Sequence, residues 1–363
     1  MTDDLTTRLA KAHAACPRTI AWRRPATPGA AFAELADACR ELGIDEWDTY
    51  AEHGAVELLE SRVKELTGKP AAAYFPSGIM AQQAALRIHS ERAGSPRVAL
   101  PDLSHLLTHE EDGPRIVSGL RPEFLTHGFE APTAAHLAAL PGRFGAVLVE
   151  LPLRDAGCLL PTFDELVELA AACRERGIAF HIDGARIWES QDWLGRPLPE
   201  IAGLADTIYV SFYKGLGGLA GAVLVGDGDV IAEARLWRRR MGGTIYRNTA
   251  EAVSALAGLE HRLPLMGACV AWARAFAAAL PGGITVQPGV PHTNQFLVYA
   301  GADPEVINQR LLAHAESRGL ALGGPWRPGP EPDRAMAEFN IGDGALALDA
   351  EEIAEMVGRT VVG

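Results

Sequence analysis

Short apolar runs alternate with helical patterns through most of the sequence, and this alternation restricts the fold more than any other feature. Each run has the length and the apolar composition of a buried strand. Strands that alternate with helices predict βαβ units, and hence an α/β fold whose mostly parallel sheet is covered by helices on both faces. The runs are AAAYF (71–75), RVAL (97–100), GAVLVEL (145–151), IAFHID (178–183), TIYVSF (207–212) and GAVLVG (221–226).

The segments between these runs have the periodicity of amphipathic helices. Gly68 and Gly177 lie where a helix C-cap favours a left-handed backbone, and Thr162 and Asp164 are suitable N-cap residues. The helices are expected over residues 55–68, 79–94, 163–177 and 229–243.

The last third of the chain has a different pattern. Residues 249–280 predict a long Ala-rich helix that is broken at Pro264. Two strands, a helix near 304–317, another strand pair and a closing helix at 349–357 follow, with a Pro-rich loop at 327–334. This order of elements is typical of a small α+β module.

The length of 363 residues favours a large domain with a smaller one. We expect a large domain over residues 46–250 and a small C-terminal α+β domain over residues 251–363. An N-terminal segment, residues 1–45, is expected to pack with the small domain.

Charge and cysteine content exclude several classes of protein. The net charge of −13 argues against nucleic-acid binding, because that binding needs a basic face. No window approaches the ~18 apolar residues of a membrane span, and the first residues lack the apolar core of a signal peptide. Reduced cysteines and a cytoplasmic location are expected, since the five cysteines are far apart and odd in number.

The most informative stretches are HIDGARIWES (181–190) and DTIYVSFYKGLGG (206–218). Taken alone, Asp183 is a carboxylate that caps the helix starting at Gly184, and Lys214 is a solvated lysine in a turn. Both residues, however, lie at the carboxyl ends of consecutive predicted strands, where open α/β sheets form their sites. A buried carboxylate beside an amine suits pyridoxal phosphate, which needs a lysine for its Schiff base and an aspartate at its pyridine nitrogen.

Two further stretches fit the same cofactor. In YFPSGIMAQQ (74–83), Ser77 and Gly78 begin a helix whose free N–H groups attract a phosphate. In DLSHLLTHEEDG (102–113), His105 and His109 are one helical turn apart. These histidines lack the H-E-x-x-H order of a zinc helix, so we expect no metal and assign a histidine ring to the face of the cofactor.

Together these motifs resemble the threonine aldolase branch of the β-eliminating lyase family, within the aspartate-aminotransferase-like fold of pyridoxal-phosphate enzymes (fold type I). The resemblance covers residues 45–250 well and the ends loosely. It implies a large domain with a mostly parallel central sheet and a smaller C-terminal α+β domain.

The family's cofactor-binding residues have counterparts in this chain. Ser77 and Gly78 match the phosphate motif P-S-G-T-M-x-N, and Ile79 replaces its usual threonine. His105 matches the histidine that stacks on the pyridine ring, with Glu110 five residues further on.

Asp183 and Arg186 match the D-G-A-R motif, and Lys214 matches the Schiff-base lysine, with Tyr213 where serine is usual. The segment RRRMGGTIYRN (238–248) is similar to L-G-G-G-M-R-Q. It implies that Arg247, and also Arg239, contact the phosphate bound by a neighbouring subunit, whereas Arg235 and Arg238 are interpreted as a solvated helix face.

Substrate contacts follow less closely from the resemblance. Tyr50 and Glu52 lie in DTYAEHGAVELLE (48–60), which resembles the family stretch D-x-Y-G-E-D-x-x-x-x-L-E. Arg186 is implied to bind the substrate carboxylate. The family's C-terminal arginine stands in an R-x-V-T pattern, which this chain replaces with AMAEFNIG (335–342), near Arg334 and Arg327.

The resemblance implies an enzyme that cleaves a threonine-like β-hydroxy-α-amino acid to glycine and an aldehyde by retro-aldol Cα–Cβ cleavage. His105 or His109 is the expected base, and Lys214 carries the cofactor, in a homodimer or homotetramer. Alternatives are β-elimination or transaldol exchange on a related amino acid, and a non-catalytic protein that binds the cofactor or an effector. The presence of Lys214, Asp183 and His105 argues against the last of these.

Overall fold

The computed structural model describes residues 2–23 and 27–363, and the chain divides into two compact units. The larger unit is Ala31–Leu263, and the smaller combines Met1–Ala30 with Pro264–Gly363. The first division, after Ala30, comes earlier in the chain than the domain boundary predicted after residue 45. The second division, after Leu263, comes later than the boundary predicted after residue 250. The second division moves because α12 (Thr249–His261) packs against α3 (Gly54–Thr67) within the larger unit.

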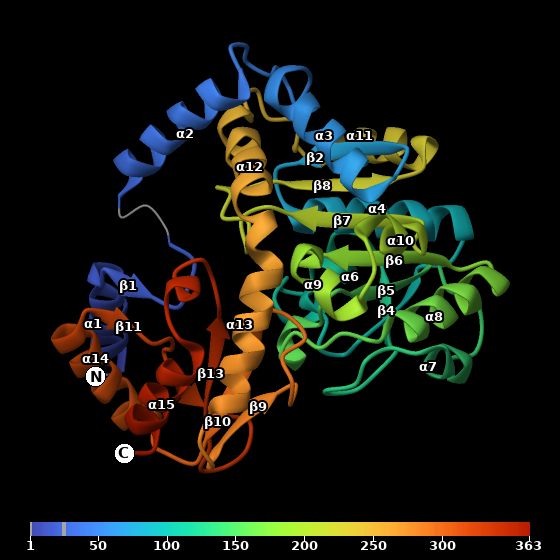
Figure 1. Ribbon diagram of the computed structural model, residues 1–363. Helices are drawn as coiled ribbons and strands as arrows, with labels where there is room; N and C mark the ends of the chain where they lie inside the picture. Colours follow the sequence, from blue (N-terminus) through green and yellow to red (C-terminus); the bar gives the residue numbers. More distant parts are fainter. Residues whose placement is uncertain (1, 24–26) are drawn as a thin grey trace. The chain divides into compact units, whose positions relative to one another are not determined.

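A seven-stranded sheet forms the centre of the larger unit, in the order β2-β8-β7-β6-β5-β3-β4 (Figure 1). The strands from β7 to β4 pair in parallel, and β8 runs antiparallel to both of its neighbours. The strands are β2 (Ala71–Phe75), β3 (Arg97–Leu100), β4 (Arg121–Phe124), β5 (Ala146–Glu150), β6 (Ala179–Gly184), β7 (Thr207–Ser211) and β8 (Ala222–Gly226). The prediction of a mostly parallel sheet is confirmed.

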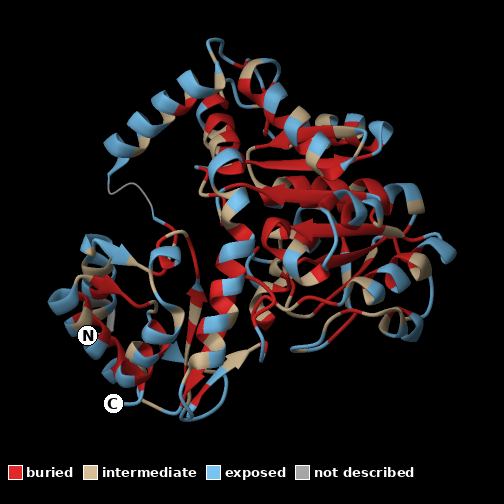
Figure 2. Ribbon diagram, in the orientation of Figure 1, coloured by how far each residue is buried: buried red, intermediate tan, exposed pale blue. Residues whose placement is uncertain are grey.

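Helices join and cover these strands. Most of their residues that face the sheet are buried, and their outer faces are exposed (Figure 2). The remaining helices are α4 (Gly78–Ala93), α5 (His105–Thr108), α6 (Gly113–Ile116), α7 (Ala134–Ala139), η1 (Arg154–Ala156), α8 (Phe163–Glu175), α9 (Ile187–Leu194), α10 (Leu198–Gly203) and α11 (Gly228–Arg240). A further helix, α2 (Pro28–Leu42), is largely exposed and begins at the end of the smaller unit.

The helix ends follow from local hydrogen bonds. Thr162 and Glu165 form a reciprocal capping box at the start of α8, so Thr162 is the N-cap and Asp164 lies in the first turn. Gly68 has the predicted left-handed C-cap conformation, with φ 67°. Gly177 is also left-handed, although it follows the C-cap residue Arg176.

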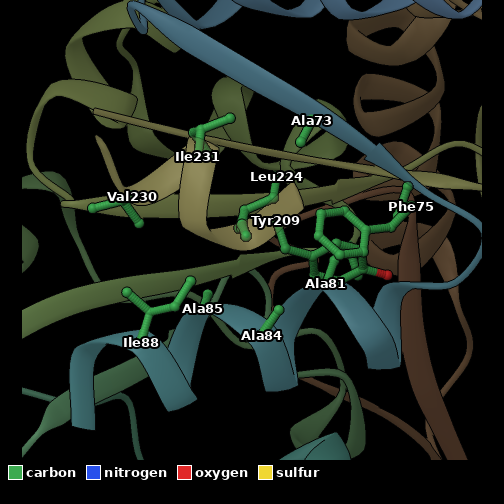
Figure 3. Packing of buried hydrophobic residues seen from close by; sticks show 13 residues of the cluster. Ala73, Phe75, Ala81, Ala84, Ala85, Ile88, Tyr209, Leu224, Val230 and Ile231 are labelled. Carbon is green, nitrogen blue, oxygen red and sulfur yellow. The ribbon is translucent and has the colours of Figure 1, made fainter. Parts of the chain in front are cut away.

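The core beside the site is made of small and branched side chains on α4, β2 and β8. Ala81, Ala84 and Ile88 lie on one face of α4 and point toward Leu224 of β8 (Figure 3). Their spacing of three, four and seven residues is that of a buried helical stripe. This packing fixes the start of α4 over the central strands.

The smaller unit contains an antiparallel four-stranded sheet, in the order β12-β13-β10-β9, and a parallel pair of two-residue strands, β1 and β11. Within this unit, Phe276, Phe296 and Phe339 stack with ring centroids between 5.6 and 6.2 Å apart. Its strands are β1 (Arg18–Thr19), β9 (Ile284–Gln287), β10 (Gln295–Ala300), β11 (Leu320–Ala321), β12 (Arg327–Pro328) and β13 (Ala335–Asn340). Its helices are α1 (Thr2–Ala15), η2 (Leu263–Leu265), α13 (Met266–Ala279), α14 (Pro304–Arg318), η3 (Ala345–Ala347) and α15 (Ala350–Val361).

Two predictions about elements need correction. The segment 327–334 is not wholly a loop, because Arg327 and Pro328 form β12 and pair with β13. The helix expected from Gly184 starts three residues later, at Ile187, since Gly184 still pairs with Val210 in the sheet. The break of the long helix at Pro264 is confirmed by η2. Across the described residues, none of the helices has the length and apolar character needed to cross a membrane.

Candidate active site

The carboxyl ends of β5, β6 and β7 bring together an amine and two carboxyl groups. Glu150 and Asp183 are register partners at the ends of adjacent strands, and Lys214 follows β7 by three residues. All three line one pocket. Its complete lining is Ile79, Gln82, His105, Glu110, Glu150, Pro152, Arg154, Asp183, Ala185, Arg186, Tyr209, Tyr213 and Lys214.

Burial changes the acidity of the Lys214 amine. Loss of hydration is the largest effect, and with the nearby positive charge of Arg186 it lowers the pKa of Lys214 to about 8. The carboxyl groups of Asp183, Glu150 and Glu189 oppose this shift without cancelling it. A larger fraction of this amine is therefore unprotonated at neutral pH than of an ordinary lysine, and the unprotonated amine is the nucleophile.

Asp183 is held at the pocket by the turn that follows β6. Its Oδ1 accepts the N–H of Ala185 at 2.9 Å, and the Ser211 hydroxyl donates to the Ala185 carbonyl at 2.9 Å. Asp183 is 4% exposed. The Asp183 carboxylate is thus fixed by a hydrogen bond within the turn that precedes α9, whose N-cap is Arg186.

Glu150 is a buried carboxyl group that the sequence analysis missed. Its Oε1 accepts the backbone N–H of His105 at 2.6 Å. Burial and the adjacent Asp183 carboxylate raise the pKa of Glu150 to about 7, although the Ser104 side chain and the N–H of His105 act in the opposite direction. A partial signal for this residue was present, since Glu150 is the last residue but one of the strand predicted over residues 145–151.

The two predicted histidines lie in different positions. His105 lines the pocket, and its Nδ1 is 3.4 Å from Oε1 of Glu110, whose side chain is 1% exposed. His109 is not part of the pocket lining; its Nε2 is 2.8 Å from Oδ2 of Asp155. The two imidazole rings are 5.1 Å apart and tilted by 45°, so His109 flanks His105.

The start of α4 borders the same region. Ser77 is the N-cap, and its Oγ accepts the N–H of Met80 at 3.3 Å. The N–H groups of Gly78 and Ile79 belong to the first turn, where helix donors have no partner within the helix. Ile79 lines the pocket and is 41% exposed. This helix start can bind an anion.

Two arginines line the pocket, and only Arg186 was predicted. Arg154 lies in η1, directly after the turn that follows β5, and its Nη1 donates to Oδ1 of Asp155 at 3.1 Å. No sequence motif indicates that Arg154 belongs to the site. The turn through Pro152, which also lines the pocket, brings Arg154 there. Together, the guanidinium groups make this pocket suitable for a small molecule that carries a carboxylate.

Arg247 and Tyr50 lie together, outside the pocket lining. The Arg247 guanidinium donates to the Thr49 hydroxyl at 2.7 Å and to the Asp48 carbonyl. The Tyr50 ring is 51% exposed and packs edge-on against Tyr246, with centroids 5.3 Å apart. Tyr50 and Tyr246 are exposed on the larger unit, and Arg247 is half-buried beside them.

In the basic cluster near residue 238, two arginines are less exposed to solvent than predicted. Arg238 is 4% exposed and donates to the Tyr74 carbonyl at 2.6 Å, and the half-buried Arg235 pairs with Glu60. The interpretation of both as a solvated face is therefore wrong, while Arg239 is exposed. Arg334 belongs to the smaller unit, where it donates to the Thr285 hydroxyl at 2.6 Å.

Comparisons with known proteins agree with the sequence resemblance. Residues 30–303 match the family model described as beta-eliminating lyase. The chain is 28% identical to low-specificity L-threonine aldolase 1 of Arabidopsis thaliana over 73% of this chain and 77% of the relative. It is 30% identical to the aldolase vrtJ of Penicillium aethiopicum, over 79% of this chain and 74% of the relative.

A solved structure is similar over the whole fold. The crystal structure of a candidate L-allo-threonine aldolase from Listeria monocytogenes EGD-E has a TM-score of 0.90 and 33% sequence identity, covering 98% of this chain and 99% of that chain. The predicted α/β architecture of the fold-type-I enzymes is thereby confirmed.

Proposed function

Since the chain belongs to the beta-eliminating lyase family, we propose that it is a pyridoxal-phosphate-dependent aldolase. Its substrate would be a threonine-like β-hydroxy-α-amino acid, and its products glycine and an aldehyde. The observation that carries this proposal is the convergence of Lys214, Asp183 and His105 on one pocket, in a chain that resembles threonine aldolases over most of its length.

The donor set of the pocket fits pyridoxal phosphate. Lys214 offers a partly unprotonated amine for its aldehyde carbon, and Asp183 offers a buried carboxylate for its pyridine nitrogen. His105 would lie against the ring, and the first turn of α4 at Ser77, Gly78 and Ile79 would hold the phosphate. When bound, the cofactor supplies an electron sink for the electrons of the Cα–Cβ bond.

Three residues are proposed to contact the substrate. Arg186 binds the α-carboxylate and so fixes the direction of the bond that breaks, because a guanidinium grips a carboxylate through two parallel hydrogen bonds. Tyr50 is proposed as a further substrate contact. Arg334 is kept as a proposed contact of the substrate carboxylate.

A base must take the proton of the β-hydroxyl group as the Cα–Cβ bond breaks. The O–H electron pair then forms the second bond of the aldehyde carbonyl, and general-base help of this kind contributes ~10²–10⁴-fold. His105 is the proposed base because its ring lines the pocket and Glu110 lies beside its Nδ1. His109 is the second candidate, and it would act through water from its position beside Asp155.

The site is proposed to be completed by a second copy of the chain. Arg247, and also Arg239, would contact the phosphate bound by the neighbouring subunit in a homodimer or homotetramer. Exposed aromatic side chains surround Arg247: Trp47 is 65% exposed and Tyr246 is 55% exposed. Closed symmetric oligomers commonly bury such apolar surfaces.

An aldehyde-release screen tests the proposed function. The purified protein, supplied with pyridoxal phosphate, is mixed with a panel of β-hydroxy-α-amino acids, and glycine and aldehyde are measured together. We expect equal amounts of both products from at least one substrate. Pyruvate and ammonia in their place would indicate β-elimination, and cofactor binding without any product would indicate a non-catalytic protein.

A further inference from the structure

Glu150 connects the floor of the pocket to the histidine in its wall. The residue ends β5, is 4% exposed and lies beside Asp183 in the register of the sheet. Its Oε1 accepts the N–H of His105, the first residue of α5, at 2.6 Å. That N–H has no partner within the helix, because it belongs to the first turn.

The short helix has few other means of fixing its first turn. Its N-cap, Ser104, makes no side-chain capping bond, and α5 has only four residues. A buried N–H that loses its acceptor costs ~1–3 kcal/mol, so the carboxyl group of Glu150 stabilises this backbone position directly. The direction of the His105 ring depends on the same backbone.

Two buried carboxyl groups on neighbouring strands cannot both be ionised without a large cost in free energy. Asp183 and Glu150 are both buried, and the charges that face Glu150 are Asp183 on β6, His105 on α5 and Lys214 after β7. Burial and Asp183 raise the pKa of Glu150 to about 7. Below this pH, the Glu150 carboxyl group is therefore mostly protonated.

We propose that Glu150 is a positioning residue that holds His105 in the pocket wall while acting as a neutral hydrogen-bond acceptor. This inference rests on the proposed function for its consequence in catalysis, and on the geometry alone for its effect on His105. It predicts that an uncharged group with an oxygen acceptor can replace Glu150, whereas an apolar group of similar size cannot.

The test uses the full chain with pyridoxal phosphate and compares Glu150→Gln with Glu150→Leu. The first readout is the NMR signal of the His105 ring in histidine-labelled protein, identified by its loss in a His105→Gln variant. We expect Glu150→Gln to keep the signal and to retain activity within about threefold. Glu150→Leu should move or broaden the signal and lower activity about 30-fold, since its acceptor is lost.

Glu60→Leu is the matched control. Glu60 is also a buried carboxyl group that accepts a backbone N–H, from Tyr74 at 2.7 Å, but it does not line the pocket. We expect this variant to lose stability and to leave the His105 signal unchanged. If Glu150→Leu does not fold, Glu150→Asp replaces it, because its shorter side chain withdraws the acceptor from His105.

The neutral state of Glu150 is tested by pH. In the cofactor-free protein, the carbon-13 signal of the Glu150 carboxyl group, identified by its loss in Glu150→Gln, should titrate near pH 7. The inference is overturned if Glu150→Leu leaves the His105 signal unchanged, if Glu150→Gln disturbs it equally, or if the Glu150 carboxyl group titrates at the ordinary pH of a glutamic acid. A wild type that releases no glycine would instead overturn the proposed function and leave these His105 readouts intact.

Discussion

A Cβ atom on Gly78 would lie 2.1 Å from the hydroxyl oxygen of Tyr209, so the first turn of α4 comes this close to β7 only because residue 78 has no side chain. Tyr209 is 2% exposed and lines the pocket. Its ring cannot retreat without displacing the core shown in Figure 3. The close contact therefore sets the distance between the helix start and the pocket floor.

Replacement of Gly78 by alanine should move the first turn of α4 away from Tyr209. Overpacking of a core costs ~1–3 kcal/mol. We expect Gly78→Ala to weaken pyridoxal phosphate binding by about tenfold or more, which is ~1.4 kcal/mol. Titration of cofactor absorbance measures this change. Gly228→Ala is the control, since a Cβ there meets nothing within 4 Å, and equal affinity in both variants would refute the role of the contact.

Asp183→Asn should leave the fold nearly intact and remove most of the activity. The amide oxygen can still accept the N–H of Ala185, which Asp183 accepts at 2.9 Å. A neutral amide cannot match the charge-assisted hydrogen bond to a protonated ring nitrogen. We expect a loss of kcat of about 100-fold, or ~2.7 kcal/mol. Activity within a few-fold of wild type, in a variant with the wild-type melting temperature, would exclude this pairing.

The stability of the cofactor-free protein should depend on pH through Lys214. Burial lowers the pKa of Lys214 from 10.5 to about 8, so between these values the unfolded chain holds a proton that the folded chain has released. The contribution of Lys214 to the free energy of unfolding therefore rises with pH between about 8 and 10.5. Below pH 8, the free-energy cost of burying the charged amine is constant. Lys214→Met removes that cost and should stabilise the protein by about 2 kcal/mol at neutral pH.

Urea unfolding at several pH values measures this effect as a difference between Lys214→Met and wild type. The difference should shrink as the pH rises from about 8 toward 10.5. A difference that stays constant over this range would show that the Lys214 amine has its ordinary pKa.

Arg247→Ala should weaken cofactor binding, and mixing it with Lys214→Ala should restore activity. In a mixed dimer whose subunits share sites, one site keeps both Lys214 and Arg247. Arg240→Ala is the control, because Arg240 belongs to the same basic cluster and lies over the Trp237 ring. If subunits exchange and no activity returns, Arg247 acts only within its own chain, where it contacts Thr49.

The elements around the site could be predicted because each strand is a separate apolar run and each helix has its own caps. His105 and Lys214 follow β3 and β7, Asp183 lies at the end of β6, and the parallel sheet brings the ends of these strands to one edge. The sequence could not establish which strands are neighbours. Glu150 was missed for that reason, since its importance comes from its register with Asp183.

The sequence also contained a signal that contradicts one prediction. Val230, Ala234 and Arg238 are four residues apart on α11, and all three are buried. Helical periodicity therefore placed Arg238 on the buried face, while its charge favoured solvent. The structure resolves this conflict through the hydrogen bond from Arg238 to the Tyr74 carbonyl, which satisfies the buried guanidinium. Arg154 had no comparable signal.

The identity of the lysine that binds the cofactor can be measured without knowledge of the substrate. The sequence has four lysines, and Lys214 is the one that lines the pocket, whereas Lys69 donates to the Ala205 carbonyl. The protein is loaded with pyridoxal phosphate, reduced with borohydride, digested and examined by mass spectrometry. We expect the added mass on Lys214 alone, and a Lys214→Ala variant that is colourless, unlabelled and inactive. A label on Lys11, Lys64 or Lys69, or a reducible linkage that persists in Lys214→Ala, would refute the assignment of this pocket as the active site.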